Sequence, residues 1–269
     1  MVKCVYIFFY SGKTTIFIFH NFFPELPTLS RRLTKKNPTD KKMAATAVEP
    51  AFLVMLTVPH STCPEFPRTG HPCDYAAQTS ATHLKKALER AGLPCELFVA
   101  DVPRGTSDMN REESRGSKWR ERIERRMASG RVVLVLDVHS FPDLPDDDPR
   151  DVFKGRSLVT MRLAEWTAAD IKFSEPDEAV AWQKQLATKV QQDTQLPTAA
   201  TLGSRVNDIM LQAFDHGLPS ALLEFSERLD HRQLPVVCRS IAEFIVAMLR
   251  RSLPAAEVRS TTDMAHSLF

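Results

Sequence analysis

The chain has 269 residues, of which 43% are hydrophobic and 25% are charged, and its formal net charge is +2 at pH 7. This composition is that of an ordinary globular protein and excludes a largely disordered chain. Eight of the 35 Lys and Arg residues, but only two of the 33 Asp and Glu residues, lie in residues 1–42, so the remainder has a net charge of −4. An acidic remainder argues against nucleic-acid binding.

Residues 1–47 differ in composition from the rest of the chain. They are rich in Phe and β-branched residues at first and basic afterwards. A secretory signal or membrane anchor needs a continuous apolar core, which residues 11–15 (SGKTT) interrupt. A mitochondrial presequence fits the charge but not the Phe clusters. We therefore expect residues 1–47 to be a leader that is disordered or outside the fold, with Met43 as a natural start before the first core strand.

Short apolar runs alternate with amphipathic segments from residue 51 onward. Unbroken apolar runs predict strands at 51–58, 95–100, 131–138, 157–164 and 219–225, and helical spacing predicts helices at 73–92, 112–130, 177–193, 207–217 and 234–253. Strands with apolar interiors that alternate with helices predict an α/β sheet covered by helices on both faces. One domain over residues 48–254 accommodates them, followed by a flexible tail at 255–269.

The five cysteines form an odd, sparse set, which argues against a disulfide framework and for a reducing compartment. We therefore expect a cytoplasmic protein, with mitochondrial targeting by the basic leader as the alternative. Four potential zinc ligands, however, lie within 14 residues, namely His60, Cys63, His71 and Cys73. Their spacing is not that of a standard zinc finger.

Polar residues occur where the predicted strands end, and in α/β sheets ligands bind at the carboxyl ends of the strands. The first strand ends at His60, the central strand at His139, and the late strand contains Glu224. Two imidazoles and a carboxylate, with the fourth position left to water, make a catalytic zinc arrangement. The carboxylate ligand could be Asp74 or Glu65, which leaves Glu224 free to act as a general base. Asp137 could orient one imidazole.

Each of these residues also has a structural interpretation. A single His beside an apolar strand is commonly a hydrogen-bonded core residue, and Asp74 could simply cap the helix that follows it. Glu224 is harder to explain in that way, because a carboxylate in an apolar strand is costly to bury without a partner. The guanidinium of Arg111, next to Asn110, could bind a substrate carboxylate, or it could be an ordinary surface group.

Four short motifs, in this order along the chain, resemble the N-formylglutamate amidohydrolase family, which is related to the zinc carboxypeptidases and to acylases of N-acyl amino acids. They are VPHS (58–61), DMNR (108–111), DVHSFP (137–142) and GLPSALLEF (217–225). The resemblance implies a mixed, largely parallel central sheet flanked by helices. It also implies that one zinc ion is bound by His60, His139 and Asp74, that Asn110 and Arg111 hold a substrate carboxylate, and that Glu224 is catalytic.

The chain departs from the family pattern just after the first motif. Thr62 stands where the family usually has Gly, and Cys63 stands where the carboxypeptidase relatives carry a Glu ligand. The third ligand therefore stays open among Asp74, Glu65 and Cys63.

Three functional hypotheses follow. The leading one is a zinc-dependent amidohydrolase that acts on an N-acyl (N-formyl-like) amino acid or a related small amide bearing a carboxylate, with no nucleic-acid or membrane partner. The second is a metallocarboxypeptidase-like peptide hydrolase. The third is a non-catalytic binding module with a structural zinc ion on His60, Cys63, His71 and Cys73. The sequence makes no prediction of the oligomeric state.

Overall fold

The structure is a computed structural model that describes residues 5–10, 13–18, 52–63, 73–142, 144, 153–163, 176–203 and 207–252. The chain divides into two compact units, Met1–Ala47 and Val48–Phe269. In the first unit, β1 (Val5–Tyr10) and β2 (Lys13–Ile18) form an antiparallel pair that we did not predict. The predicted tail, residues 255–269, lies outside the described residues.

The second unit is built on a six-stranded sheet with the order β4-β3-β5-β8-β6-β7. The strands are β3 (Leu53–Val58), β4 (Cys95–Val99), β5 (Val132–Phe141), β6 (Leu158–Leu163), β7 (Thr198–Gly203) and β8 (Ser220–Ser226). Four of the five neighbouring pairs are parallel, and only β6 and β8 pair antiparallel. The predicted α/β class with a mixed, largely parallel sheet is confirmed.

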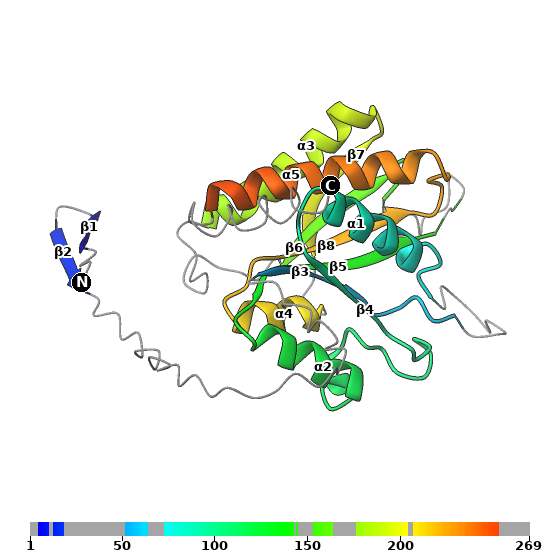
Figure 1. The fold of residues 1–269 in the computed structure, drawn as a ribbon, viewed down its shortest axis with the longest axis horizontal. Coiled ribbons are helices and arrows are strands. Elements are labelled where there is room, and N and C mark those ends of the chain that lie inside the picture. Colours follow the sequence, from blue (N-terminus) through cyan, green and yellow to red (C-terminus); the bar gives the residue numbers. More distant parts are fainter. Residues whose placement is uncertain are drawn as a thin grey trace, which may run out of the picture. The chain divides into compact units, whose positions relative to one another are not determined.

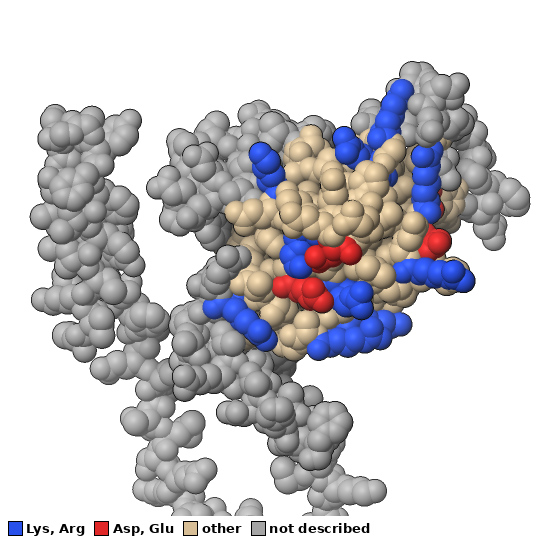
Figure 2. Space-filling model, turned by 90° about the horizontal axis from the view of Figure 1, so that it is seen from above, with Lys and Arg blue, Asp and Glu red and all other residues tan. Residues whose placement is uncertain are grey.

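Helices cover both faces of this sheet (Figure 1). On one face lie α1 (Ala77–Arg90), α3 (Pro176–Thr194) and α5 (Gln233–Ser252); on the other lie α2 (Lys118–Met127) and α4 (Asp208–Asp215). Within the described residues, none of these helices has the length and apolar character needed to cross a bilayer. Seen from above, in Figure 2, Lys and Arg side chains are dispersed over the described surface, some beside Asp or Glu side chains and others among uncharged residues.

The residues of β3 show why the sheet has two cores. Val54, Leu56 and Val58 belong to the cluster formed with α1 and α5, whereas Leu53 and Met55 belong to the cluster formed with α2 and α4. Successive side chains of a strand point to opposite faces, so a strand that is apolar at every position is stable only between two helical layers.

Two predicted elements differ from the observed ones, and one observed strand of the sheet was not predicted. The strand predicted at 131–138 continues to Phe141 as β5, so His139 lies inside the strand rather than after it. The helix predicted at 112–130 is divided into a 3-10 turn, Glu112–Ser114, and α2, because the Ser117 side chain caps α2 by accepting a hydrogen bond from the backbone N–H of Arg120. The edge strand β7 was not predicted, because its small residues (TAATLG) lack the bulky β-branched pattern of a strand.

A fully buried arginine joins the two helices below the sheet. The Arg120 guanidinium donates to the Asp208 carboxylate at 2.7 Å, to the Gln212 side chain at 2.6 Å and to the Met109 carbonyl at 2.9 Å. Asp208 also accepts two hydrogen bonds from Arg115. These bonds connect α2 and α4 to the segment that leads into Asn110.

We expect the substitution Arg120→Leu to lower the free energy of unfolding by about 3–5 kcal/mol, because breaking a buried ion pair leaves Asp208 with Arg115 as its remaining guanidinium partner and removes the donor to Gln212 and Met109. Urea unfolding measures this change. Arg122→Leu, on the exposed side of the same helix, is the matched control and should change stability by less than about 0.5 kcal/mol. Equal stabilities of the two variants would contradict the structural role of Arg120.

Candidate metal centre

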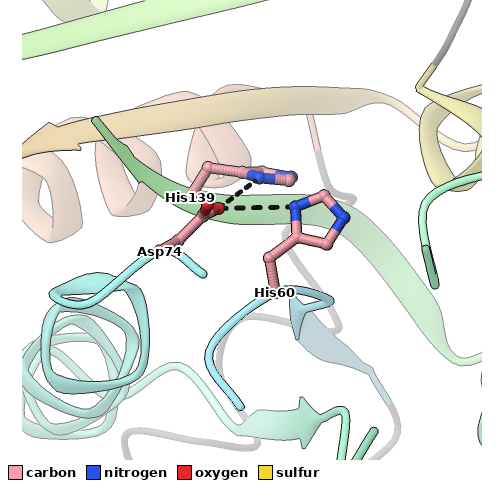
Figure 3. Close-up of side chains that lie close together, drawn as sticks. All are labelled: His60, Asp74 and His139. Carbon is pink, nitrogen blue, oxygen red and sulfur yellow. Dashed lines mark hydrogen bonds and ion pairs between the residues drawn. The ribbon is translucent and has the colours of Figure 1, made fainter. Parts of the chain in front are cut away.

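Three side chains that could hold a metal ion, those of His60, Asp74 and His139, converge near the carboxyl ends of β3 and β5 (Figure 3). Asp74 Oδ2 lies 2.8 Å from His139 Nδ1 and 3.5 Å from His60 Nδ1. One ligand atom from each residue lies within 4.8 Å of the others, and all three residues are buried. The structure therefore brings together the two histidines that the sequence predicted as ligands and Asp74, which the resemblance implied as the third.

The fold explains how three distant segments meet. His60 lies two residues beyond β3, and His139 lies in the neighbouring parallel strand β5. Asp74 precedes α1, and its backbone N–H donates to the His60 carbonyl at 2.9 Å. The two imidazole rings meet edge to face with their centroids 4.9 Å apart. The three side chains are thus held by main-chain pairing as well as by one another.

The Nε2 atom of each imidazole, which faces away from Asp74, is bonded by a further carboxylate. His60 Nε2 bonds Asp108 Oδ1 at 2.6 Å, and His139 Nε2 bonds Asp137 Oδ2 at 2.8 Å. Such outer carboxylates fix the tautomer and orientation of metal-binding histidines. With both Nε2 atoms engaged, both Nδ1 atoms are directed toward Asp74, as Figure 3 shows.

Asp137 is itself held from several directions. It accepts hydrogen bonds from the Thr57 hydroxyl at 2.6 Å and from the amide groups of Asn110 at 3.0 Å and Asn207 at 2.8 Å. Asn207 also caps α4 by accepting from the backbone N–H of Met210. The orientation of His139 is therefore fixed by a buried network that spans β3, β5 and the start of α4.

The residues fit a bound cation. His60 Nδ1 is buried and makes no hydrogen bond within the described residues. Burial works against a charged imidazole at His139, but the charges and hydrogen bonds of Asp137 and Asp74 outweigh it and raise the pKa of His139 well above its usual value. Two imidazole nitrogens and a carboxylate oxygen form a donor set typical of catalytic zinc. This site can hold a metal ion.

Glu224 lies beside these groups on β8, where it pairs in register with His139 of β5. Burial is the main cause that raises the pKa of Glu224 to about 7; the nearby charge of His139 opposes the shift and that of Asp74 adds to it. A carboxyl group with a pKa near neutrality can both accept and donate a proton under physiological conditions.

The DMNR segment, between β4 and the 3-10 turn, contributes polar groups around the site. Asn110 is buried, and its amide donates to Asp137 and accepts from the backbone N–H of Ile209. The Arg111 side chain is 36% exposed, with its Nε 3.3 Å from Asp108 Oδ2. A second guanidinium, that of Arg104, lies 3.6 Å from both Asp74 and Asp108.

Sequence reasoning assigned no role to Asp108, Arg104 or Asn207. Asp108 stands in a motif that we singled out, two residues before Asn110, so the motif itself was a signal. Arg104 lies in a loop with no distinguishing pattern. The contact of Asn207 with Asp137 spans 70 residues, and no local pattern predicts it.

A disulfide bond links Cys63 and Cys73, although the number of cysteines argued against a disulfide framework. The two residues are brought together because the chain returns to His60 at Asp74, and their Cα atoms are 5.1 Å apart. In this state Cys63 offers no thiolate ligand. Glu65 and His71, the other alternative ligands, lie outside the described residues.

The double substitution Cys63→Ser, Cys73→Ser separates two predicted zinc sites. We expect this variant to retain its zinc, because His60, Asp74 and His139 need neither cysteine. Elemental analysis after dialysis measures it, and wild-type protein treated with a reductant is the control. Loss of zinc from the variant would instead support the structural site on His60, Cys63, His71 and Cys73.

No protein-family model matches the sequence, and no curated protein matches it. Several solved structures share the general path of the chain. A metallo-carboxypeptidase from Burkholderia cenocepacia is 9% identical, with 77% of this chain and 59% of that one covered and a TM-score of 0.49. The gene product Atu2144 from Agrobacterium tumefaciens is 15% identical, with 77% and 92% covered and a TM-score of 0.47.

An N-acetylmuramoyl-L-alanine amidase from Clostridium difficile 630 is 8% identical, with 75% of this chain and 98% of that one covered and a TM-score of 0.46. At this level of similarity the three structures carry no conclusion about the activity of this chain. The case for a function rests on the residues of the site.

Proposed function

We propose that this protein is a zinc-dependent hydrolase that cleaves the amide C–N bond of an N-acyl (N-formyl-like) amino acid or a related small amide bearing a carboxylate. One observation carries the proposal. Two imidazole Nδ1 atoms and a carboxylate oxygen converge in a buried site. The Nε2 atom of each imidazole is bonded by another carboxylate, Asp108 for His60 and Asp137 for His139. Glu224, with its raised pKa, lies beside them.

His60, Asp74 and His139 would hold the ion, and Asp108 and Asp137 would keep the imidazoles in the ligating orientation. Zinc in this position would polarise the substrate carbonyl and lower the pKa of water. Glu224 would accept the proton of the attacking water and deliver it to the departing amine nitrogen. The products are a carboxylic acid and an amine, and Glu224 returns to its starting state.

The substrate carboxylate is assigned to the Asn110–Arg111 segment. The partly exposed guanidinium of Arg111 can donate paired hydrogen bonds to a carboxylate. Asn110 is buried and bonded to Asp137. Its proposed contribution to substrate binding therefore depends on holding this segment against the site.

We expect Arg111→Ala to raise KM for an N-acyl amino acid about ten- to 100-fold with a smaller change in kcat, because hydrogen bonds between charged groups contribute about 1.5–3 kcal/mol. Steady-state kinetics on the acid and on its neutral carboxamide measure the effect. The carboxamide should show no such difference between variant and wild type. Equal losses on both compounds would contradict carboxylate binding by Arg111.

The substrate class itself is tested by assaying N-formyl and other N-acyl amino acids beside short peptides with free C-termini. Turnover of the acyl amino acids supports the proposal. Turnover confined to the peptides would support the metallocarboxypeptidase alternative, in which the same ligands and the same Glu224 act on a peptide C-terminus. Zinc binding without turnover of either class would support a non-catalytic module.

A further inference from the structure

Two backbone amides that directly follow Asp74 are bound by side chains from the carboxyl ends of β5 and β8. The N–H of Tyr75 donates to Glu227 Oε1 at 3.0 Å, across 152 residues of sequence. The N–H of Ala76 donates to the Ser140 hydroxyl at 3.1 Å, across 64 residues. The Ser140 hydroxyl in turn donates to the same Glu227 Oε1 at 2.8 Å. Glu227 Oε1 therefore accepts two hydrogen bonds, one from the backbone of Tyr75 and one from the Ser140 hydroxyl.

These bonds fix the start of α1. The first N–H groups of a helix have no partner inside the helix and need acceptors from elsewhere. The residue before α1, Ala76, has no side chain that could cap it. Glu227 and Ser140 supply acceptors just ahead of the helix, so the position of α1 and of the preceding Asp74 depends on contacts with β5 and β8.

The same contacts connect the segments that carry Asp74, His139 and Glu224. Ser140 immediately follows the ligand His139 in β5, and Tyr75 immediately follows the ligand Asp74. Glu227 lies three residues beyond Glu224, and its own N–H donates to the Phe141 carbonyl at 3.1 Å. Ser140 is only 4% exposed. Its hydrogen bonds are therefore largely shielded from water, where they are stronger than at the surface and costly to lose.

We propose that Glu227 is a positioning residue for the metal centre. Through Ser140 and the backbone of Tyr75 it sets the distance between Asp74 and His139, and so determines the affinity and geometry of the site without touching metal or substrate. This inference rests on the proposed metal-binding role of His60, Asp74 and His139. It adds a carboxylate that acts on the backbone, whereas Asp108 and Asp137 act on the imidazoles.

Cobalt(II) titration of the full chain tests this role, because both the affinity and the visible absorption spectrum of bound cobalt report on ligand geometry. We expect Glu227→Ala to weaken cobalt binding about ten- to 100-fold, the usual effect of removing an outer partner of a metal site, and to alter the spectrum. Glu227→Gln should restore both, because glutamine keeps the single oxygen on which both hydrogen bonds end.

Ser140→Ala and Ser240→Ala form a matched pair. Both serines are buried and donate to a carboxylate, but Ser240 bonds Asp193 between α3 and α5, away from the site. Only Ser140→Ala should weaken cobalt binding and change the spectrum. This pair also decides the question if Glu227→Ala does not fold.

The outcomes separate the two proposals. A wild-type chain that binds no cobalt and no zinc overturns the proposed function and this inference with it. A wild-type chain that binds cobalt, with Glu227→Ala and Ser140→Ala unchanged in affinity and spectrum, overturns the positioning role alone. A Glu227→Gln variant as impaired as Glu227→Ala would also contradict it, because the hydrogen-bonding oxygen would then be insufficient.

Discussion

Replacing His139 with alanine is expected to abolish metal binding and hydrolysis together. His139 is one of the three converging residues that could hold the ion, and it is also the group through which Asp137 and its buried network act on the site. Its removal leaves two ligands and a buried Asp137 carboxylate without its imidazole partner. Because removing even an outer partner of a metal site costs about ten- to 100-fold in affinity, removing a ligand should cost more than about 100-fold.

The measurements for His139→Ala are zinc content by elemental analysis and kcat/KM in the presence of added zinc. His231→Ala, at an exposed position before α5, is the matched control and should retain both. Circular dichroism of the two variants shows whether the fold is kept. A folded His139→Ala protein that still binds zinc with wild-type affinity would mean that the ion is held elsewhere.

Glu224→Gln should leave zinc in place and lower kcat by about 10²–10⁴-fold, the range attributed to general acid–base catalysis. Glutamine has nearly the same shape as glutamate but cannot take a proton from water. Glu224 lies outside the group His60, Asp74 and His139 that could hold the ion, so metal content should not change. Metal content therefore distinguishes the two variants: His139→Ala should lose metal and activity, whereas Glu224→Gln should lose activity alone.

Glu243→Gln, on the exposed side of α5, controls for the loss of one carboxylate charge and should keep its activity. If Glu224→Gln retains full turnover with an N-acyl amino acid, the proton transfer belongs to another group. If it loses zinc, Glu224 contributes to metal binding rather than to proton transfer.

The fold could be predicted from the sequence where burial imposes a continuous pattern. The apolar run of β5 and the helical spacing of α1 and α5 give unambiguous signals, because these elements are packed against the core. The prediction failed where local chemistry or tertiary contacts decide. The Ser117 cap divides one predicted helix, and the edge strand β7 is held by pairing with β6 despite its weakly strand-forming residues.

The candidate site could be predicted as a set of residue types but not as a geometry. Strand-end positions pointed to His60 and His139, and parallel neighbours bring such positions together at one edge. The choice of Asp74 over other carboxylates depended on the resemblance, and the structure now places it between the two imidazoles. The contacts of Asn207 and Glu227 join residues at least 70 positions apart, so no local pattern reveals them.

The central claim is that one metal ion is held by His60, Asp74 and His139. Its most direct test is the number of zinc ions bound per chain, measured by elemental analysis after the full-length protein has been saturated with zinc and dialysed. We expect one zinc ion per wild-type chain. A wild-type chain that retains no zinc after saturation would contradict the claim.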